Sequence, residues 1–449
     1  MGKLFGTDGI RGVVNESLDA VLAYQVGLAA AKVLGEANGK SRPLFTIGKD
    51  TRISSDLLES ALIAGLCSAG ADVMQLGVIP TPAVAYITVE AKADAGIVIS
   101  ASHNPFEHNG IKIFNGQGFK LSDELENQIE AVIFDGCNVA RKTHGDLGRV
   151  YNGELKQSEA YINHLASTVE DDLHGLRILV DCANGASSAT ADRLFDLFSA
   201  EVDIINEEPD GVNINNGCGS THLDLLAHKV AEGGYDVGIA FDGDADRCLA
   251  VDETGETIDG DQIMAICGTE MKREGRLSGD AIVATVMSNI GFHIFAKENG
   301  IQVPCTDVGD RNVLEKMLEC GYKLGGEQSG HTIFLDYATT GDGQLTALQF
   351  LQVLSRSGKK ASELASICKK YPQVLINVPV ASKEDKVRIM ADGGLKAETA
   401  RWEEVLNGEG RILIRPSGTE ALIRVMVEGK DPDQAQRCAE ALAEYVRNC

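Results

Sequence analysis

Three aspartates at alternate positions, Asp242, Asp244 and Asp246, form the densest group of chemically capable residues in the sequence. Carboxylates this close repel one another at neutral pH, and a divalent cation removes that repulsion. Ligation by oxygen alone suits Mg²⁺ or Ca²⁺ better than zinc. An EF-hand is excluded because Arg247 occupies its glycine position, although Glu253 stands at its twelfth position. The cluster predicts a metal site, and its structural alternative is an acidic surface turn.

A second candidate is the serine-rich segment at residues 100–105, with the sequence Ser-Ala-Ser-His-Asn-Pro. The apolar run 95–99 precedes it and predicts a strand, and Pro105 prevents the following backbone from joining a sheet ladder. We therefore expect a strand that delivers the Ser102 hydroxyl to a rigid loop. Serine, asparagine and proline are also common in turns for conformational reasons, so the segment by itself leaves a purely structural turn open.

Two further loops have residue types that bind phosphates and sugars. Residues 415–419, Arg-Pro-Ser-Gly-Thr, combine a guanidinium group, two hydroxyls and a glycine, and Arg424 is nearby. An arginine fork matches the oxygens of a phosphate bidentately. Glu327 and Ser329 offer an acceptor and a hydroxyl for a sugar. The sequence has neither a P-loop nor a well-placed Gly-x-Gly-x-x-Gly, so nucleotide binding is not supported.

The composition limits the class of protein. The 449 residues carry a formal net charge of −25 at pH 7, which argues against broad contact with nucleic acid or anionic lipid, because both require a basic face. An anionic substrate would need a local group of basic residues. The N-terminus shows no signal segment, and no apolar run reaches the roughly 18 residues of a membrane span. The 11 cysteines include no Cys-x-x-Cys pair and indicate a reducing cytoplasm.

The apolar runs predict three α/β units that position these loops. In each unit strand and helix patterns alternate, and a late strand is followed by a polar loop, at residues 100–105, 242–247 and 325–331. Open α/β sheets bind ligands at such strand ends. We expect three tandem doubly wound α/β domains and a smaller C-terminal α+β domain. The expected boundaries are 1–155, 156–256, 257–370 and 371–449.

Some single elements are also predicted. The pattern favours one helix over 188–198, a strand at 301–303 and one long helix over 385–406. The last helix should begin at Asp431 and Pro432, because aspartate is a good N-cap and proline fits the first helical position.

The four loops together, in this order, resemble the α-D-phosphohexomutase superfamily of phosphoglucomutases and phosphomannomutases over nearly the whole chain. Residues 100–105 resemble its phosphoserine loop, 242–247 its magnesium loop, 326–331 its sugar-recognition loop and 415–420 its phosphate loop. Similarity to the branch that acts on glucosamine phosphate is carried by residues 5–12, Gln328, 339–343 and 423–429. The departures from that branch, which bear on the sugar and not on the reaction class, are Ala245, Pro416 and Ala421.

The resemblance implies interconversion of glucosamine 6-phosphate and glucosamine 1-phosphate, an early step toward UDP-N-acetylglucosamine and cell-wall precursors. Ser102 would pass a phosphoryl group to the sugar, and a bisphosphate intermediate would turn around and return its other phosphate to Ser102. Mg²⁺ would bind at Ser102, Asp242, Asp244 and Asp246. Glucosamine or glucose 1,6-bisphosphate would serve as activator.

Roles for further residues follow from the same resemblance. The implied catalytic residues are Ser102, Arg11, His103, Lys112, Arg247 and His331, and for His331 a packing role is as well supported as proton transfer. The implied substrate-binding residues are Glu327, Ser329, Arg415, Ser417, Gly418, Thr419 and Arg424. The last domain is expected to close on the intermediate. The expected partner is a phosphosugar, without nucleic acid or membrane, in the cytoplasm, and a homodimer is left open.

Other hypotheses stay open on the sequence alone. The same mechanism could act on glucose or mannose phosphate. A magnesium-dependent phosphatase with an attacking aspartate, and a phosphosugar-binding protein without catalysis, are alternatives from other classes.

Overall fold

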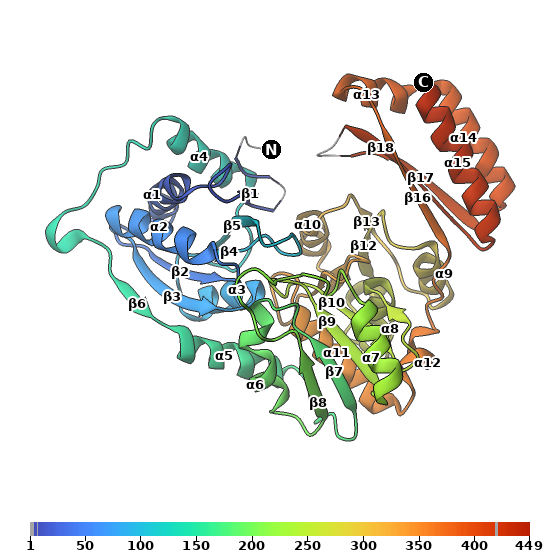
Figure 1. The fold of residues 1–449 in the computed structure, drawn as a ribbon, viewed down its shortest axis with the longest axis horizontal. Coiled ribbons are helices and arrows are strands. Elements are labelled where there is room, and N and C mark those ends of the chain that lie inside the picture. Colours follow the sequence, from blue (N-terminus) through green and yellow to red (C-terminus); the bar gives the residue numbers. More distant parts are fainter. Residues whose placement is uncertain (1–3, 7, 418–420) are drawn as a thin grey trace. The chain divides into compact units, whose positions relative to one another are not determined.

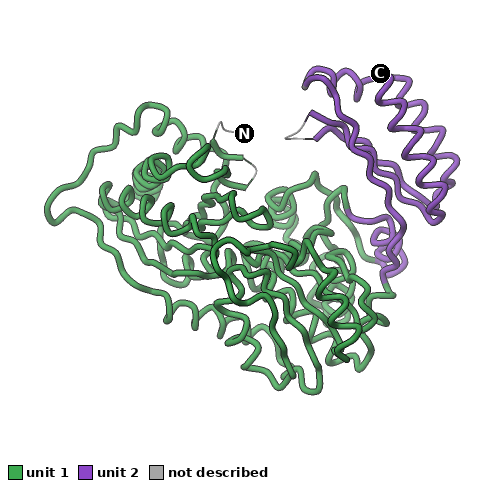
Figure 2. Tube along the Cα trace, viewed as in Figure 1, with its two compact units in different colours: residues 1–287, 301–367 green, residues 288–300, 368–449 purple. Residues whose placement is uncertain are grey.

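A computed structural model describes residues 4–6, 8–417 and 421–449. Its contacts divide the chain into two compact units (Figure 2). Unit 1 comprises residues 1–287 and 301–367, and unit 2 comprises residues 288–300 and 368–449. Three of the sheets follow one another in unit 1, and unit 2 has a sheet of its own (Figure 1).

The first sheet has the strand order β1-β5-β4-β2-β3-β6, in which the last four strands are parallel, β5 is antiparallel to β4, and β1 is antiparallel to β5. Side chains alternate between its faces, as in any strand. Phe45 and Ile47 belong to the core formed with α1 and α2, whereas the Thr46 hydroxyl lies 2.6 Å from that of Thr88 on α3. The elements are β1 (Ile10–Val13), α1 (Ala20–Ala37), β2 (Leu44–Lys49), α2 (Ser55–Ser68), β3 (Asp72–Val78), α3 (Thr81–Glu90), β4 (Ala95–Ile99), β5 (His108–Asn115), α4 (Asp123–Phe134), η1 (His144–Asp146), β6 (Val150–Asn152) and α5 (Glu154–Ser167).

The second sheet has the order β11-β10-β9-β7-β8, in which β8, β7 and β9 are parallel, β10 is antiparallel to β9, and β11 is antiparallel to β10. All five residues of β9 are buried, as expected for a central strand. The elements are β7 (Arg177–Asp181), η2 (Ala186–Ala189), α6 (Ala191–Phe195), β8 (Glu201–Ile205), α7 (Asp224–Gly233), β9 (Val237–Phe241), β10 (Cys248–Asp252) and β11 (Thr257–Ile258).

The third sheet has the order β13-β12-β14-β15, and only β15 is antiparallel to its neighbour. The elements are α8 (Gly260–Arg273), η3 (Ser278–Asp280), β12 (Ile282–Thr285), β13 (Cys305–Thr306), α10 (Asp310–Cys320), β14 (Leu324–Gly326), β15 (Thr332–Phe334), α11 (Gly343–Ser357) and α12 (Ala361–Ala365).

The three sheets share one feature that positions the predicted loops. In each of them the polar loop joins a parallel strand to the antiparallel strand that follows it, β4 to β5, β9 to β10 and β14 to β15. The expectation of three α/β units followed by a smaller C-terminal domain is confirmed. The sheets are mixed rather than wholly parallel.

Unit 2 contains an antiparallel sheet of order β16-β18-β17. Its core includes Val425, Val427, Ala439 and Leu442, so the apolar stripe of the last helix packs on the central strand. The elements are α9 (Ile290–Glu298), β16 (Gln373–Pro379), α13 (Lys383–Ala391), α14 (Gly393–Leu406), β17 (Gly410–Pro416), β18 (Leu422–Gly429) and α15 (Pro432–Asn448).

Three predicted elements differ from the structure. Residues 188–198 form the short η2 and α6 rather than one helix, and instead of a strand at 301–303 there is a single bridge from Gln302 to Ala281. The predicted helix over 385–406 is broken at Asp392, whose extended backbone caps α14 through a 2.8 Å bond from Leu395 N to Oδ1. An aspartate that caps the backbone competes with continuation of the helix. The predicted start of α15, with Asp431 as N-cap, is confirmed.

Helix α1 is the one described helix that is long and apolar enough to cross a membrane by length and composition. More than half of its apolar window is buried within the protein, and residues such as Val26 and Leu28 belong to the core of the first sheet. It is therefore a core helix.

Candidate active site

Ser102 directly follows β4, whose five residues are all buried. Its φ of 54° lies in the left-handed region, which costs a residue other than glycine about 1–2 kcal/mol. The residue is 1% exposed, and its Oγ donates a 2.6 Å hydrogen bond to Oδ2 of Asp242. His103 Nδ1 lies 3.4 Å from the same Oγ. The strained backbone is thus found at the residue expected to react, as is common at functional sites.

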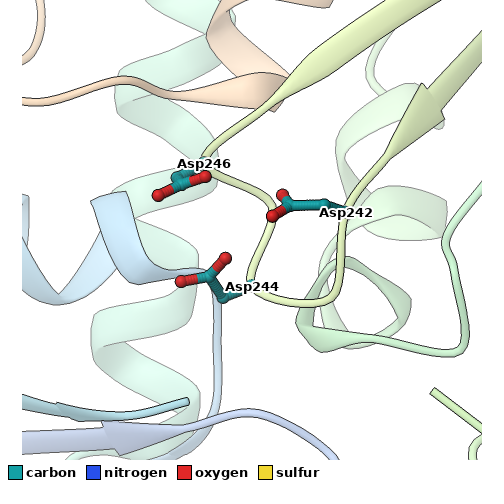
Figure 3. A group of neighbouring side chains, drawn as sticks. All are labelled: Asp242, Asp244 and Asp246. Atoms are coloured by element: carbon teal, nitrogen blue, oxygen red, sulfur yellow. The ribbon is translucent and has the colours of Figure 1, made fainter. Parts of the chain in front are cut away.

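The three aspartates lie on the loop between β9 and β10, and their carboxylates converge (Figure 3). One ligand oxygen of each lies within 4.8 Å of the others, and all three residues are buried. Ala245 adopts a φ of 56°, so this loop takes a left-handed turn at an alanine. The predicted cluster is therefore present as one compact group of oxygens.

The charges of this cluster are only partly compensated by protein groups. Burial, then the Asp246 and Asp244 charges, raises the pKa of Asp242 well above its ordinary value. Burial alone would raise the pKa of Asp246, but His331 and Lys112 lower it. Oδ1 of Asp244 and Oδ1 of Asp246 are buried and accept no hydrogen bond from the described residues. Carboxylate and hydroxyl oxygens with free lone pairs fit a hard divalent cation such as Mg²⁺.

Lys112 is the main positive charge against the cluster. Its side chain is 1% exposed, and its Nζ lies 2.8 Å from Asp244, 3.1 Å from Asp8 and 3.8 Å from Asp246. Burial opposes the charge of Lys112, but Asp244 and Asp8 raise its pKa well above the usual range. It is therefore charged at neutral pH.

Lys112 belongs to a closed network of oppositely charged side chains that connects the first and third α/β units. Asp8 also pairs with Lys120, and Lys120 pairs with Asp310 at the start of α10. His331 Nε2 lies 3.8 Å from Asp310, and its Nδ1 lies 3.6 Å from Asp246, which returns the network to the acidic loop. The sequence analysis missed Asp8, Lys120 and Asp310, because each lies in a polar segment where no local pattern distinguishes it.

The predicted sugar loop connects β14 to β15. Glu327 is half-buried and accepts a 3.0 Å hydrogen bond from Gly309 N, while Ser329 is exposed. Gln328 Nε2 donates to Asp259, the N-cap of α8, at 3.3 Å. The loop thus offers a fixed carboxylate and an accessible hydroxyl.

His331 ends this loop and is 3% exposed. Gly341 N donates to its Nε2 at 3.2 Å, and a Cβ on Gly341 would lie 2.5 Å from the ring. Burial lowers the pKa of His331, but Asp246 and Asp310 raise it above its ordinary value. The bond from Gly341 favours the neutral ring, and the two carboxylates favour the charged one.

Three other predicted residues lie near the serine and the acidic loop. Burial, then the charges of Arg247 and Arg11, lowers the pKa of His103 to about 4, so it is neutral at pH 7. Arg247 N donates to Asp242 Oδ1 at 3.2 Å, and its Nε lies 3.8 Å from Asp246. Arg11 lies on β1 and pairs with Asp8.

The predicted phosphate loop lies in unit 2. Arg415 on β17 and Arg424 on β18 are directly opposite each other in the antiparallel register. Two guanidinium groups at such positions are close enough to bind the oxygens of one phosphate. Lys386, which the sequence analysis missed, is buried and donates to Ser417 O at 2.7 Å. Gly418 and Thr419 lie outside the described residues.

Comparison with known proteins agrees with this arrangement. Four family models match the chain in order: phosphoglucomutase/phosphomannomutase alpha/beta/alpha domain I at residues 2–139, domain II at 159–255, domain III at 259–371 and the C-terminal domain at 375–445. The exact boundaries predicted at residues 155, 256 and 370 stay a prediction.

Curated relatives match over the full length. The phosphoglucosamine mutase of Acetivibrio thermocellus is 54% identical, and that of Ruminiclostridium cellulolyticum is 55% identical, each with 99% of both chains covered. Among solved structures, a phosphoglucomutase/phosphomannomutase family protein of Burkholderia thailandensis has a TM-score of 0.81 at 23% identity, with 99% and 98% of the chains covered. Aspergillus fumigatus N-acetylphosphoglucosamine mutase, in complex with GlcNAc-6P and magnesium, has a TM-score of 0.74 at 17% identity, with 99% and 95% covered.

The three α/β/α domains, the C-terminal domain and the acidic loop beside a buried serine define the class: a phosphohexomutase of the phosphoglucomutase/phosphomannomutase superfamily. At 51–55% identity over the full length, the chain belongs to the phosphoglucosamine mutase family of enzymes.

Proposed function

We propose that this chain interconverts glucosamine 6-phosphate and glucosamine 1-phosphate by means of a phosphoryl group carried on Ser102. The observation that carries the proposal is the 2.6 Å hydrogen bond from Ser102 Oγ to Asp242 within the buried carboxylate cluster. A phosphoserine has nearly two negative charges, so it is tolerable here only beside added positive charge. The full-length identity to phosphoglucosamine mutases supports the choice of sugar.

Ser102, Asp242, Asp244 and Asp246 are the residues that would hold Mg²⁺. The bound ion would neutralise charge on the oxygens of the transferring group. Lys112 supplies a fixed positive charge 2.8 Å from Asp244 and holds that carboxylate in place.

In each phosphoryl transfer one oxygen–phosphorus bond forms and another breaks. A free sugar hydroxyl forms a bond to phosphorus while the bond from phosphorus to Ser102 Oγ breaks. The proton of the sugar hydroxyl moves to a base, and Ser102 Oγ gains a proton. The second half-reaction reverses these steps with the other phosphate of the bisphosphate. His103, neutral at pH 7, and His331, between two carboxylates, are the assigned proton carriers.

Further residues are assigned to recognition of the substrate. Glu327 and Ser329 are proposed to bind sugar hydroxyls, and Arg11 and Arg247 to add positive charge near the transferring group. The residues assigned to the phosphate that does not react are Arg415, Ser417, Gly418, Thr419 and Arg424. The cross-strand position of the two arginines supports this assignment, because two neighbouring guanidinium groups can both bind the oxygens of one phosphate.

The remaining proposals concern cellular context. Glucosamine or glucose 1,6-bisphosphate is proposed as the activator. The 11 cysteines without a Cys-x-x-Cys pair support a cytoplasmic protein, and the net charge of −25 supports one that binds neither nucleic acid nor a membrane surface. A homodimer is compatible with this role and is tested by measuring the mass of the protein in solution.

The test begins with intact mass after incubation with glucose 1,6-bisphosphate and Mg²⁺. One added phosphoryl group that maps to Ser102, and is absent in Ser102→Ala, is expected. Turnover of the 6-phosphates of glucosamine, glucose and mannose is then compared, with glucosamine expected to be fastest. No phosphate on Ser102, or glucosamine ranking last, would overturn the proposal.

A further inference from the structure

Two residues outside the four predicted loops, Asp50 and Arg52, lie directly behind the Ser102 loop. They follow β2, and β2 runs parallel to β4 with Lys49 paired to Ile99. Asp50 N donates to Ile99 O at 3.0 Å, which holds the two strand ends together. The carboxyl ends of neighbouring parallel strands therefore bring Asp50 and Arg52 to the loop that carries Ser102.

Arg52 has every one of its five side-chain donors engaged, although its side chain is 0% exposed. Nε donates to Asp50 Oδ2 at 2.8 Å. The other four bonds go to backbone carbonyls, three in the serine segment and one at the start of β5: Nη2 donates to Ser102 O at 2.8 Å and to Asn104 O at 2.9 Å, and Nη1 donates to Pro105 O at 2.5 Å and to His108 O at 3.0 Å. One planar guanidinium group thus fixes three carbonyls of the Ser102 loop and the first carbonyl of β5.

Asp50 completes the arrangement from the other side. Its Oδ2 also accepts from Ser100 Oγ at 2.6 Å, and its Oδ1 accepts from Ser55 Oγ at 3.1 Å. Ser100 Oγ in turn accepts from Ser102 N at 2.9 Å. The amide of Ser102 is therefore connected to Asp50 through one hydroxyl, and its carbonyl is connected to Asp50 through Arg52.

The second sheet adds one more bond to the same carbonyl. Asn215 Nδ2 donates to Ser102 O at 2.9 Å and to Asn104 O at 3.2 Å. Both the amide and the carbonyl of Ser102 are thus held, which explains how a serine keeps a φ of 54°. In that conformation its Oγ reaches Asp242.

We propose that Asp50 and Arg52 form a buried positioning pair that, together with Asn215, holds Ser102 in the left-handed conformation needed for phosphoryl transfer. The inference rests on the proposed role of Ser102. Neither Asp50 nor Arg52 bonds to the three aspartates, so the pair acts through the loop backbone. A hydroxyl that repeatedly accepts and releases a phosphoryl group must return to one place, and small displacements are costly in rate.

The test compares Arg52→Lys with Arg42→Lys. Arg42 is in the same α/β unit and makes a bidentate pair with Asp72, but its side chain is 37% exposed and lies on no predicted loop. A lysine keeps the charge but has one nitrogen in place of a planar fork, so it cannot fix four carbonyls. The readouts are kcat and KM for glucosamine 6-phosphate, the rate at which glucose 1,6-bisphosphate phosphorylates Ser102, and Tm.

For Arg52→Lys we expect kcat and the phosphorylation rate to fall about 100-fold with KM within about threefold, as for a misplaced reacting group. Arg42→Lys should match the wild type in all three kinetic readouts. Ser100→Ala removes one hydroxyl and is expected to lower the phosphorylation rate about tenfold in a fully folded protein. It serves as the second variant if Arg52→Lys does not fold.

The outcomes separate this inference from the proposed function. If the wild type is phosphorylated on Ser102 and folded Arg52→Lys is phosphorylated equally fast, the positioning pair is refuted and the proposed function stands. The same holds if the loss of kcat only follows the loss of folded protein, or if Ser100→Ala keeps the wild-type rate. A wild type that never carries phosphate on Ser102 overturns both.

Discussion

Ser102 Oγ lies 2.6 Å from Oδ2 of Asp242, although the two residues are 140 positions apart and belong to different sheets. The hydroxyl and the carboxylate come from two loops of the same kind, each joining a parallel strand to an antiparallel one. A metal bound by the acidic loop would therefore also be close to the phosphoryl group that Ser102 is proposed to carry.

Asp242→Asn is expected to remove the stabilisation by Mg²⁺ without destabilising the metal-free protein. The variant removes one of three buried carboxylates that repel one another, so Tm without metal should be equal to or above that of the wild type. Saturating Mg²⁺ should raise the Tm of the wild type, since a ligand at 100 times its Kd stabilises by about 2.7 kcal/mol, and should not raise that of the variant. Thermal unfolding with and without Mg²⁺ measures both effects.

The exposed residue Asp196 gives the control for this experiment. Asp196→Asn should keep the full response to Mg²⁺. A variant at Asp242 that retains the wild-type response would show that the metal binds elsewhere.

Lys112→Met is expected to destabilise the protein because two carboxylates lose their positively charged partner. Asp244 and Asp8 lose a buried partner at 2.8 and 3.1 Å, and breaking such a pair costs about 3–5 kcal/mol. Added Mg²⁺ should restore part of the loss because it compensates Asp244. Urea unfolding measures the free energy with and without the ion.

The same substitution at the exposed residue Lys156 should change the free energy of unfolding by less than about 0.5 kcal/mol. Equal losses at both lysines would contradict the role of the buried charge.

Asp342, the N-cap of α11, predicts a pH dependence of stability. Burial raises its pKa to about 7, while bonds from Leu345 N and from Tyr161 OH at 2.9 Å lower it and the Asp246 charge raises it slightly. The folded protein then holds a proton that the unfolded chain releases near its ordinary pKa of 3.8. The free energy of unfolding should fall as pH rises from about 4 to 7 and level off above, by up to about 1.4 kcal/mol per pH unit.

Asp342→Asn resembles the protonated carboxyl and should remove this part of the slope. Urea unfolding between pH 5 and 8 gives the difference between variant and wild type. Asp336→Asn, in a surface pair with Lys323, is the control and should leave the slope unchanged. Parallel curves for the wild type and Asp342→Asn would refute the assignment.

Glu428 is expected to stabilise the start of α9 within unit 2. Its buried carboxylate pairs with Arg411 at 3.0 Å and accepts from Asn289 Nδ2 at 3.2 Å and from Ile290 N at 2.9 Å. Glu428→Gln should cost about 2 kcal/mol, as expected for hydrogen bonds to a charged group, and should speed amide exchange in α9. Hydrogen exchange with mass spectrometry reads out the helix directly.

The exposed pair of Glu409 and Lys430 provides the comparison. Glu409→Gln should leave exchange in α9 unchanged. Faster exchange in both variants alike would point to general loosening of unit 2.

The sequence by itself determined the features that depend on nearby residues. Alternating apolar runs predicted the strands that carry Ser102 and Asp242, and spacing within five residues predicted the carboxylate cluster. Where a local signal was wrong, as at Asp392, a side-chain cap outweighed a continuous helical pattern.

Only the tertiary structure decided which distant residues meet. Lys120 and Asp310 are 190 positions apart, and Arg52 bonds to carbonyls about 50 positions away. Strand order and register bring such pairs together. Neither can be predicted from a short segment of sequence, because the packing of whole units determines which strands pair. The reactive groups could thus be predicted from local pattern, whereas the buried charges that hold them in place could not.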